Sequence, residues 1–481
     1  MSVGDTELES KHRSYRRDVA SAAMQTETNA FALFLLAAFL GLSVFVTPAV
    51  GRVVALVGLL AFLAVVLRSR WNPETRRLDL PFRVHPAICY PTLVLWAVFV
   101  LTTLLSPSPG AFVHTGAFVV FSAVALFVVP GVVSREAAFS VIALLGALGF
   151  LTSVPTVLWG NFVILGFPFS QAGPQRVVLD FAFYPPASVL DSRNYLRVLF
   201  AFGAVCAAAL YVERRRPWTL AAAAMNLAGV GLTLGRAASL ALLAVAILLV
   251  VYSLAGSEAL LGATVLGAVA TALGLAVVVG LLPGPGAAIE SALDERIRDW
   301  TSSVGAFAER PLLGWGIVDS HAAAEARYGE GFTGIHSSYI RVFVMAGVVG
   351  GLAYVALFAA ALGLAYRRVS ESAFGGLTDR RGEPSGFDLV YGRHAPDPMA
   401  LATYALVVMV LVFQLFDGAT VFGASLTSVL WALAVGYTQP ESARRRLSIA
   451  LGETDESGAR KRGPVTVEDR ARNPETLSTR R

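Results

Sequence analysis

Residues 236–282 read RAASLALLAVAILLVVYSLAGSEALLGATVLGAVATALGLAVVVGLL, a stretch with almost no charge. A helix of about 20 apolar residues crosses the hydrocarbon core of a bilayer, so this stretch is long enough for two crossings. Similar runs recur along the 481 residues, of which 56% are apolar and 15% charged. Soluble domains have roughly 45–50% and about 25%. The pattern predicts an all-α polytopic membrane protein, because helices satisfy their own backbone hydrogen bonds in lipid.

The apolar runs predict about twelve transmembrane helices. We expect them at 30–47, 50–67, 87–105, 111–130, 137–158, 195–213, 217–234, 236–254, 258–282, 337–366, 398–416 and 420–437. The expected regions are a cytoplasmic N-terminal arm, transmembrane helices 1–9, an extracytoplasmic loop with an amphipathic helix, transmembrane helices 10–12, and a disordered, basic cytoplasmic tail. Their residues are 1–29, 30–282, 283–336, 337–437 and 438–481, respectively.

The basic residues predict the orientation. With twelve spans, most of the 38 Lys and Arg residues fall on the side of the N-terminus, and such an excess marks the cytoplasmic side. We therefore expect a multi-pass protein of the cytoplasmic membrane with both termini inside. Residues 1–29 show no short apolar core with a cleavage site, so no removable signal peptide is expected. The net charge of +5 follows from these loops, so membrane lipids are expected as partners and nucleic acid is not.

Two segments, 159–194 and 283–336, are too long for simple turns and are expected outside. Loops of this length usually carry function. The second segment has apolar residues at spacings of three and four, which predicts an amphipathic helix on the outer membrane surface. These residues are Ile289, Leu293, Ile297, Trp300, Val304 and Phe307.

Few ionisable groups lie in or beside the predicted spans. Each costs at least about 2.5–3.5 kcal/mol in hydrocarbon, so those present are the first functional candidates. They gather at outer helix ends, as Arg193, Asn194, Arg197, Arg236, His336, Arg341 and Asp417. The spans contain no chain of carboxylates suited to a proton relay or to ion coupling.

Arg236 and His336 open two helices that both run from outside to inside. Their helix N-termini, which attract anions, should therefore face the same outer surface. Arg236 follows Gly235, which permits close backbone approach, and its guanidinium can bind a phosphate in two places. A helix N-terminus disfavours imidazolium, so His336 is a candidate general base. Alternatively, Arg236 is a snorkelling anchor and His336 an ordinary interfacial histidine.

The amphipathic helix adds a second arginine to this candidate site. A step of about 100° per residue places Arg296 at the edge of the apolar stripe and Arg298 on the opposite face. Arg296 can therefore point towards the membrane-side cleft, while Arg298 faces water. The alternative is that Arg296 only snorkels or pairs with Glu290 or Asp299.

The segment after His336 predicts a rigid support for it. On a continuous helix, Gly347 lies about 16 Å below His336 and on almost the same face. Gly347 and Gly351 form a small-residue pattern that favours close helix packing.

No metal site or cofactor is expected. His321 and His336 are spaced unlike a short zinc-binding pair, and no D-x-D motif occurs. Both cysteines, Cys89 and Cys206, lie in apolar runs, which argues against a thiolate cluster or a disulfide framework.

Three motifs resemble the O-antigen ligase and polymerase family of lipid-linked-glycan transferases. The first is Arg236 followed, after three residues, by Leu240. The second is RIRDWTSSVGAFAERPLLGWGI from Arg296, and the third is His336 followed, after ten residues, by Gly347 in HSSYIRVFVMAGVVGG. The number of spans and the large external loop are similar too, and the resemblance implies a GT-C-like arrangement.

The resemblance implies transfer of a glycan from a polyprenyl diphosphate carrier to an acceptor hydroxyl outside the membrane, without metal. Arg236 and Arg296 would bind the diphosphate, and His336 would activate the acceptor. Asn194 and Arg341 are additional candidates, and Arg298 competes with Arg296. The residue after His336 is Ser337, where the family commonly has Asn.

The resemblance leaves the acceptor open between a glycolipid, a glycan and a protein. It also does not separate a ligase from a polymerase. A flippase or transporter of lipid-linked oligosaccharide is the alternative from another class. That alternative predicts charges and broken helices near the middle of the bilayer, which the spans largely lack.

Overall fold

The computed structural model of the 481-residue chain describes the secondary structure of most residues up to Pro440. The described residues are 3–43, 47–72, 77–78, 82–164, 167–178, 181–188, 190, 192–278, 282, 286–329, 332, 334–379, 397–420, 422–423 and 425–440. Most of the predicted tail, from residue 441 on, lies outside them. The same holds for the side chains of Ile289 and Leu293 in the predicted amphipathic helix.

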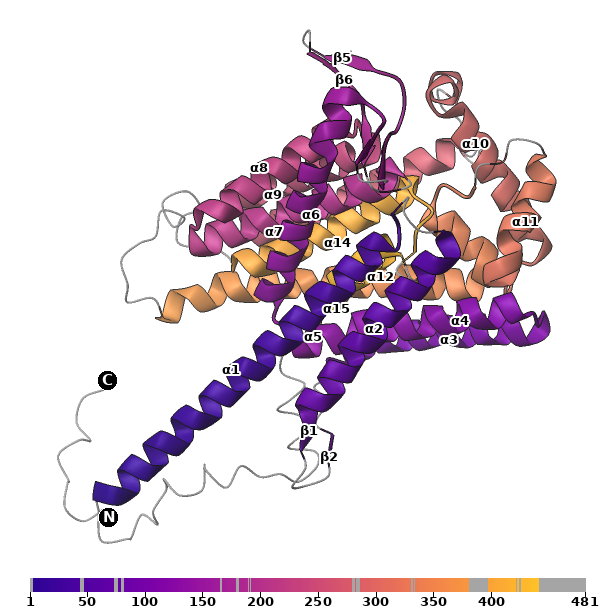
Figure 1. The fold of residues 1–481 in the computed structure, drawn as a ribbon. Helices are drawn as coiled ribbons and strands as arrows, with labels where there is room; N and C mark the ends of the chain where they lie inside the picture. Colours follow the sequence, from indigo (N-terminus) through magenta and orange to yellow (C-terminus); the bar gives the residue numbers. More distant parts are fainter. Residues whose placement is uncertain are drawn as a thin grey trace, which may run out of the picture. The chain divides into compact units, whose positions relative to one another are not determined.

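Helices make up most of the described chain (Figure 1). They are α1 Val3–Leu40, α2 Pro48–Arg70, α3 Pro86–Leu105, α4 Pro109–Ala123, the π-helix η1 Val124–Val128, α5 Val129–Val132, α6 Arg135–Trp159, α7 Arg193–Arg214, α8 Pro217–Leu232, α9 Arg236–Val278, α10 Gly286–Glu309, α11 Gly316–Tyr328, α12 Ser338–Asp379, α14 Pro398–Phe416 and α15 Leu426–Gly436. The strands are β1 Trp71–Asn72, β2 Arg77–Leu78, β3 Phe162–Ile164, β4 Phe167–Gln171, β5 Arg176–Val178, β6 Phe181–Phe183 and β7 Pro186–Ser188.

Local sequence sets where several helices begin. Ser134 accepts a hydrogen bond from the backbone N–H of Ala137 at 3.2 Å, and Ser425 accepts one from Ser428 at 3.1 Å. These side chains satisfy backbone donors that have no partner within the helix. Other helices start with a proline, which lacks the N–H that a first turn cannot pair. The starting prolines are Pro48, Pro86, Pro109, Pro217 and Pro398.

The predicted fold class, an all-α polytopic membrane protein, is confirmed. Within the described residues, nine helices are long and apolar enough to cross a membrane, where twelve spans were expected. The expected spans 236–254 and 258–282 form the single element α9, which is kinked at Gly256 with φ 77°. The other two differences are short helices, because α8 has 16 residues and α15 has 11.

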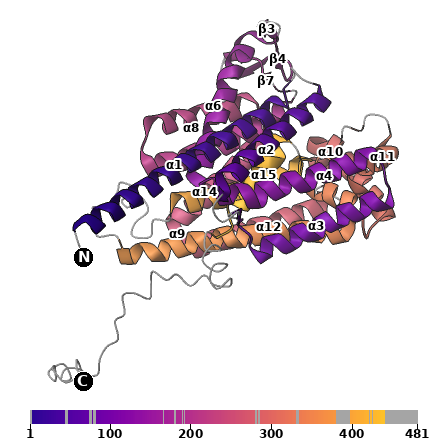
Figure 2. The same cartoon turned by 60° about the horizontal axis from the view of Figure 1, so that its bottom comes forward.

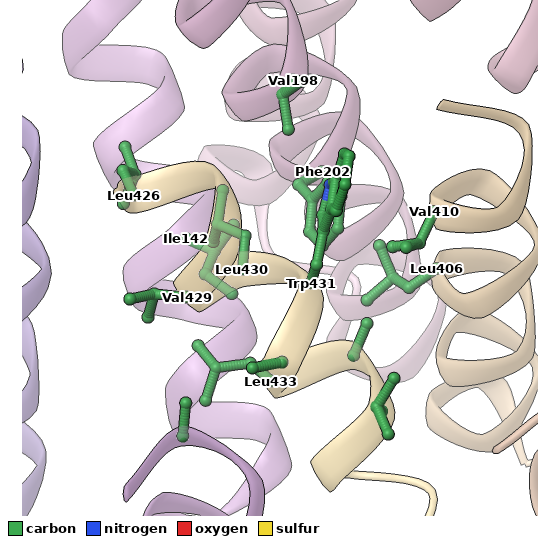
Figure 3. Packing of buried hydrophobic residues seen from close by; sticks show 14 of the residues in the cluster. Ile142, Val198, Phe202, Leu406, Val410, Leu426, Val429, Leu430, Trp431 and Leu433 are labelled. Carbon is green, nitrogen blue, oxygen red and sulfur yellow. The ribbon is translucent and has the colours of Figure 1, made fainter. Parts of the chain in front are cut away.

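The last expected span, 420–437, is wrong as a single helix. The described residues between Phe416 and Leu426, which are 417–420, 422, 423 and 425, are not helical, and α15 begins only at Leu426. Its 11 residues extend about 16 Å, roughly half the hydrocarbon thickness. Tertiary packing holds this short helix, as Figure 3 shows around Trp431, which is completely buried. Its neighbours in that view come from α6, α7 and α14 and include Ile142, Val198, Phe202, Leu406 and Val410.

Three helices form the centre of the bundle. The share of the span that is buried is 72% for α7, 61% for α12 and 78% for α14, against 28% for α2 and for α9. α7 packs against α6 and α8, whereas α12 packs against α3 and α14. Figure 2 shows α3 beside α12. The ends of the three central helices are therefore the best-supported places for functional side chains.

The start of α7, the start of α12 and the end of α14 meet at one end of the bundle, here called the loop end, which α10 also contacts. The opposite end, where α15 leads to Pro440, is called the tail end.

The expected amphipathic helix is present as α10, and it packs against α11 and α12 with Trp300 buried. The segment between α6 and α7 contains small sheets, ordered β3-β4-β7 and β5-β6.

α12 is broken at Gly347, so the expected continuous helix from His336 to Gly351 is wrong. Gly347 has φ 63°, and a Cβ atom there would overlap the backbone of Leu312. The turn between α10 and α11 fills the break. Val348 N–H donates to Pro311 at 2.7 Å, and Trp315 N–H donates to the carbonyl of Val344 at 2.9 Å. Irregular backbone within a span is tolerated where other protein groups satisfy it, so the loop supports the first part of α12.

Candidate active site

His336 lies at the loop end, two residues before α12 begins. The serines that follow it tie this point to the end of α14. The Ser338 hydroxyl donates to the carbonyl of Asp417 at 2.6 Å, and the Ser337 hydroxyl donates to Gln414 at 3.3 Å. Both serines are buried. His336 is therefore held by contacts between two of the central helices.

The chain after α14 closes over the segment that carries His336. A Cβ atom on Gly418 would overlap the carbonyl of Ile335, so only glycine allows this approach. The Arg341 guanidinium donates to the Gly418 carbonyl at 2.8 Å. The structure thus places the candidate Arg341 on the backbone after α14, where it fixes the position of Asp417.

A buried carboxylate faces the His336 ring. The Nε2 atom of His336 lies 3.7 Å from the Oδ2 atom of Asp299 in α10, and the two side chains are 33% and 2% exposed. Burial lowers the pKa of His336 below its usual value, and the positive charge of Arg296 lowers it further. Asp299 and Asp417 act in the opposite direction. The net effect favours a neutral imidazole near pH 7.

Arg296 lies near His336, Asp299 and Asp417, and these residues are here called the cluster. Arg298 is not part of it. The Nη1 atom of Arg296 donates to the carbonyl of Phe416, the last residue of α14, at 2.7 Å. The guanidinium of Arg298 is exposed and lies over the Tyr328 ring, 5.0 Å from its centroid. The faces of α10 thus separate the two arginines as its helical periodicity predicts.

Arg236 lies at the loop end, where the adjacent Gly235 packs against Arg197. It is exposed at the first position of α9, after Leu234 in a left-handed conformation with φ 48°. A Cβ atom on Gly235 would lie 2.6 Å from the Cδ atom of Arg197, so the glycine lets the turn pack on that side chain. Arg197 is 7% exposed, and its charge acts on His336. The structure therefore brings Arg236 and His336 to the same end of the bundle, with Arg197 between them in this chain of neighbours.

Asn194 lies on the first turn of α7, close in sequence to Arg197. It is half-buried, and its backbone N–H donates to the Ser192 hydroxyl at 3.2 Å. This cap starts α7 at the right place to bring Asn194 and Arg197 to the loop end.

Sequence reasoning missed the roles of Asp299 and Arg197. Asp299 was considered only as an alternative partner of Arg296, and Arg197 only as one of several polar groups at helix ends. A signal was present for Arg197, because a charge inside an apolar span is costly and marks a functional candidate. No such signal existed for Asp299, since acidic residues are common on an amphipathic helix.

The side chains near His336 do not suggest a metal centre. Within the described residues, no group of three or more His, Cys, Asp or Glu side chains could hold a metal ion. His321 instead packs on the Phe332 ring, with centroids 5.0 Å apart. Metal independence remains a prediction.

The arrangement suits acid–base chemistry beside an anionic group. The buried carboxylate of Asp299 can orient the imidazole and stabilise its protonated form. The arginines nearby stabilise negative charge, and burial strengthens their effect because the local dielectric constant is low.

Comparison with known proteins agrees with this picture. Residues 220–355 match the family model described as O-antigen ligase, and no curated protein matches the chain. The matched range contains Arg236, Arg296 and His336, the residues that begin the three motifs. The predicted resemblance to the O-antigen ligase family is thus confirmed over residues 220–355.

Proposed function

We propose that the protein transfers a glycan from a polyprenyl diphosphate carrier to an acceptor hydroxyl on the outer side of the cytoplasmic membrane. The match of residues 220–355 to the O-antigen ligase family model and the apolar helices support glycosyl transfer by a membrane protein. The observation that carries the proposal is the grouping of His336 and Asp299, 3.7 Å apart, with Arg296 at the end of α14. This grouping provides both a proton acceptor and a cationic site for a leaving group.

The arginines would act on the donor. Arg236 and Arg296 bind the diphosphate, whose negative charge grows as the glycosidic bond breaks. Fixed guanidinium groups in a partly buried site stabilise this charge more in the transition state than in the ground state. The prenyl chain stays in the bilayer, and the glycan lies in the aqueous layer around α10 and α11.

His336 would act on the acceptor. The acceptor oxygen forms a bond to the anomeric carbon, and its proton passes to His336. The bond between that carbon and the diphosphate oxygen breaks, and the diphosphate leaves with the electron pair. Asp299 stabilises the imidazolium that forms. General base catalysis of this kind contributes roughly 10²–10⁴-fold to the rate.

The length of α12 supports a site at the membrane rim. Its span of 35 residues is about 50 Å long, well above the hydrocarbon thickness of about 30 Å. The part after Gly347 is long enough to cross by itself. The first part, next to His336, can then lie at the level of the polar headgroups.

The decisive experiment is transfer by the purified protein, supplied with a polyprenyl diphosphate-linked glycan and two acceptors. One acceptor is a glycolipid, and the other is a second molecule of the lipid-linked glycan. Product on the first identifies a ligase, and elongated product on the second identifies a polymerase. Absence of transfer to either would contradict the proposal. Activity that a chelator removes and a divalent ion restores would contradict metal independence.

His336→Ala tests the proposed base. We expect transfer to fall by about 10²–10⁴-fold, with unchanged abundance in the membrane. The matched control is His321→Ala, because His321 packs on Phe332 outside the cluster. Equal transfer rates in the His336→Ala variant and the unaltered protein would remove His336 from the mechanism.

A further inference from the structure

Arg197 is a buried charge that the proposed mechanism does not yet use. It is 7% exposed, in the first turns of α7. Its Nε atom is buried and has no hydrogen-bond partner among the described residues. Such a group is costly, since a buried donor without a partner loses its hydration and gains nothing in return. A buried guanidinium nitrogen without a hydrogen-bond partner in the described part of the chain, near the end of a span, is therefore best explained by a ligand.

The charges around Arg197 indicate an anionic ligand. Asp417, Arg193 and Arg296 act on it electrostatically, and only Asp417 is negative. Together with Arg236 and Arg341, the loop end has more arginines than the two aspartates Asp299 and Asp417 can neutralise. A diphosphate that is esterified at both ends carries two negative charges, so it would reduce this positive excess.

The depth of Arg197 indicates which phosphate it would bind. Arg193 is exposed at the start of α7, and Arg236 is exposed at the start of α9. Arg197 lies one turn further along α7, about 6 Å from Arg193 along the helix axis. In a lipid-linked donor, one phosphate is attached to the prenyl chain and the other to the glycan. The deeper phosphate must be the one attached to the prenyl chain.

From this placement, we propose that Arg197 is a third donor-binding residue, which binds the phosphate attached to the prenyl chain, while Arg236 binds the phosphate attached to the glycan. This inference rests on the proposed function. Gly235 takes part in the arrangement, because it lets the turn before α9 lie against the Arg197 side chain. The buried Arg197 and the exposed Arg236 would thus bind opposite ends of the diphosphate.

Binding of two lipids separates these roles. The protein is placed in nanodiscs, and its affinities for a polyprenyl monophosphate and a polyprenyl diphosphate are measured together with its melting temperature. Arg197→Gln should weaken binding of both lipids by about 10- to 100-fold, the usual effect of losing a charge-assisted hydrogen bond. Its melting temperature should not fall. Arg236→Gln should weaken binding of the diphosphate only.

Arg176→Gln is the matched control, because Arg176 is exposed on β5 and the change of charge is the same. It should alter neither affinity. Unchanged binding of both lipids by Arg197→Gln would overturn the inference. A lower affinity that appears only with a lower melting temperature would overturn it too, since that is the effect of a structural residue.

If Arg197→Gln does not fold, Arg197→Lys provides the test. Lysine keeps the charge but lacks the planar group that binds phosphate in two places, so affinity for the monophosphate should fall several-fold. Unaltered affinity in this variant would overturn the inference.

If the unaltered protein binds neither lipid, the proposed function fails as well. If it binds both lipids, and the Arg197 variants bind them as tightly while Arg236→Gln loses affinity for the diphosphate, the proposed function stands without Arg197.

Discussion

Two buried polar side chains at opposite ends of the bundle, Gln439 and Arg197, differ in how they are hydrogen-bonded. At the tail end, Gln439 accepts a hydrogen bond from His85 N–H at 2.8 Å and donates to the carbonyl of Leu126 at 2.8 Å. The Tyr437 hydroxyl donates to Val133 at 3.1 Å. At the loop end, the Nε atom of Arg197 has no such partner among the described residues.

The paired groups at the tail end have a structural role, whereas the charged groups at the loop end are suited to bind a ligand. The partners of Gln439 include a carbonyl in η1, where the π-helical geometry changes the usual backbone pairing. Paired groups of this kind fix how α15 meets the rest of the bundle. The loop end instead has an excess of positive charge. Because uncompensated buried charge is costly, this end is stabilised when an anion binds. Changes at the loop end should therefore lower the transfer rate without lowering stability, whereas changes at the tail end should lower stability without lowering the rate of the folded protein.

After His336→Ala, the largest effect is expected from Asp299→Asn at the loop end. The variant loses the carboxylate that stabilises the imidazolium of His336, so the transfer rate should fall about 10- to 100-fold. Asp299 raises the pKa of His336, so its loss lowers this pKa further. A base must be neutral, so the rate falls as the pH drops through the pKa, and this acid limb should move to lower pH.

The measurement is the dependence of the transfer rate on pH. Asp319→Asn is the control, because Asp319 is exposed on α11. A limb that moves to higher pH in Asp299→Asn would contradict the assignment.

Arg296→Gln should have a smaller effect on the rate and the opposite effect on the pH profile. We expect a roughly 10-fold weaker affinity for the donor, from the loss of one charge-assisted contact. The charge of Arg296 lowers the pKa of His336, so its removal raises this pKa. The acid limb should move to higher pH. Arg298→Gln, on the other face of α10, should leave the profile unchanged, and equal shifts in both variants would contradict the separation of the two arginines.

The smallest effect on transfer is expected from Gln439→Ala at the tail end. It removes the partners of the His85 N–H and the Leu126 carbonyl, each costing about 1–3 kcal/mol if it stays buried and unpaired. Thermal unfolding should therefore occur several degrees lower, while each folded molecule transfers at the unaltered rate. Gln25→Ala, at an exposed glutamine on α1, is the control. A large loss of rate with normal stability would show that the tail end takes part in function.

The sequence predicted much of the site, because residue type and helical spacing are local properties. Arg236 and His336 were found from a charge or an imidazole at a helix end, and the periodicity of the amphipathic helix found Arg296 and separated it from Arg298. The break at Gly347 was not predicted, since a glycine fits both a closely packed helix and a kinked one. The pairing of His336 with Asp299 was not predicted either, because the two residues belong to different elements.

By itself, the sequence determined the fold class, most of the spans and the family resemblance, since apolar run length, the cost of charge in lipid and short motifs are properties of each segment separately. Only the tertiary structure decided which charged residues meet. The turn before α11 fills the break in α12, the backbone after α14 closes over Ile335, and Gly235 makes room for Arg197. These contacts join residues far apart in the chain, and their fit depends on packing between helices, which no local pattern specifies.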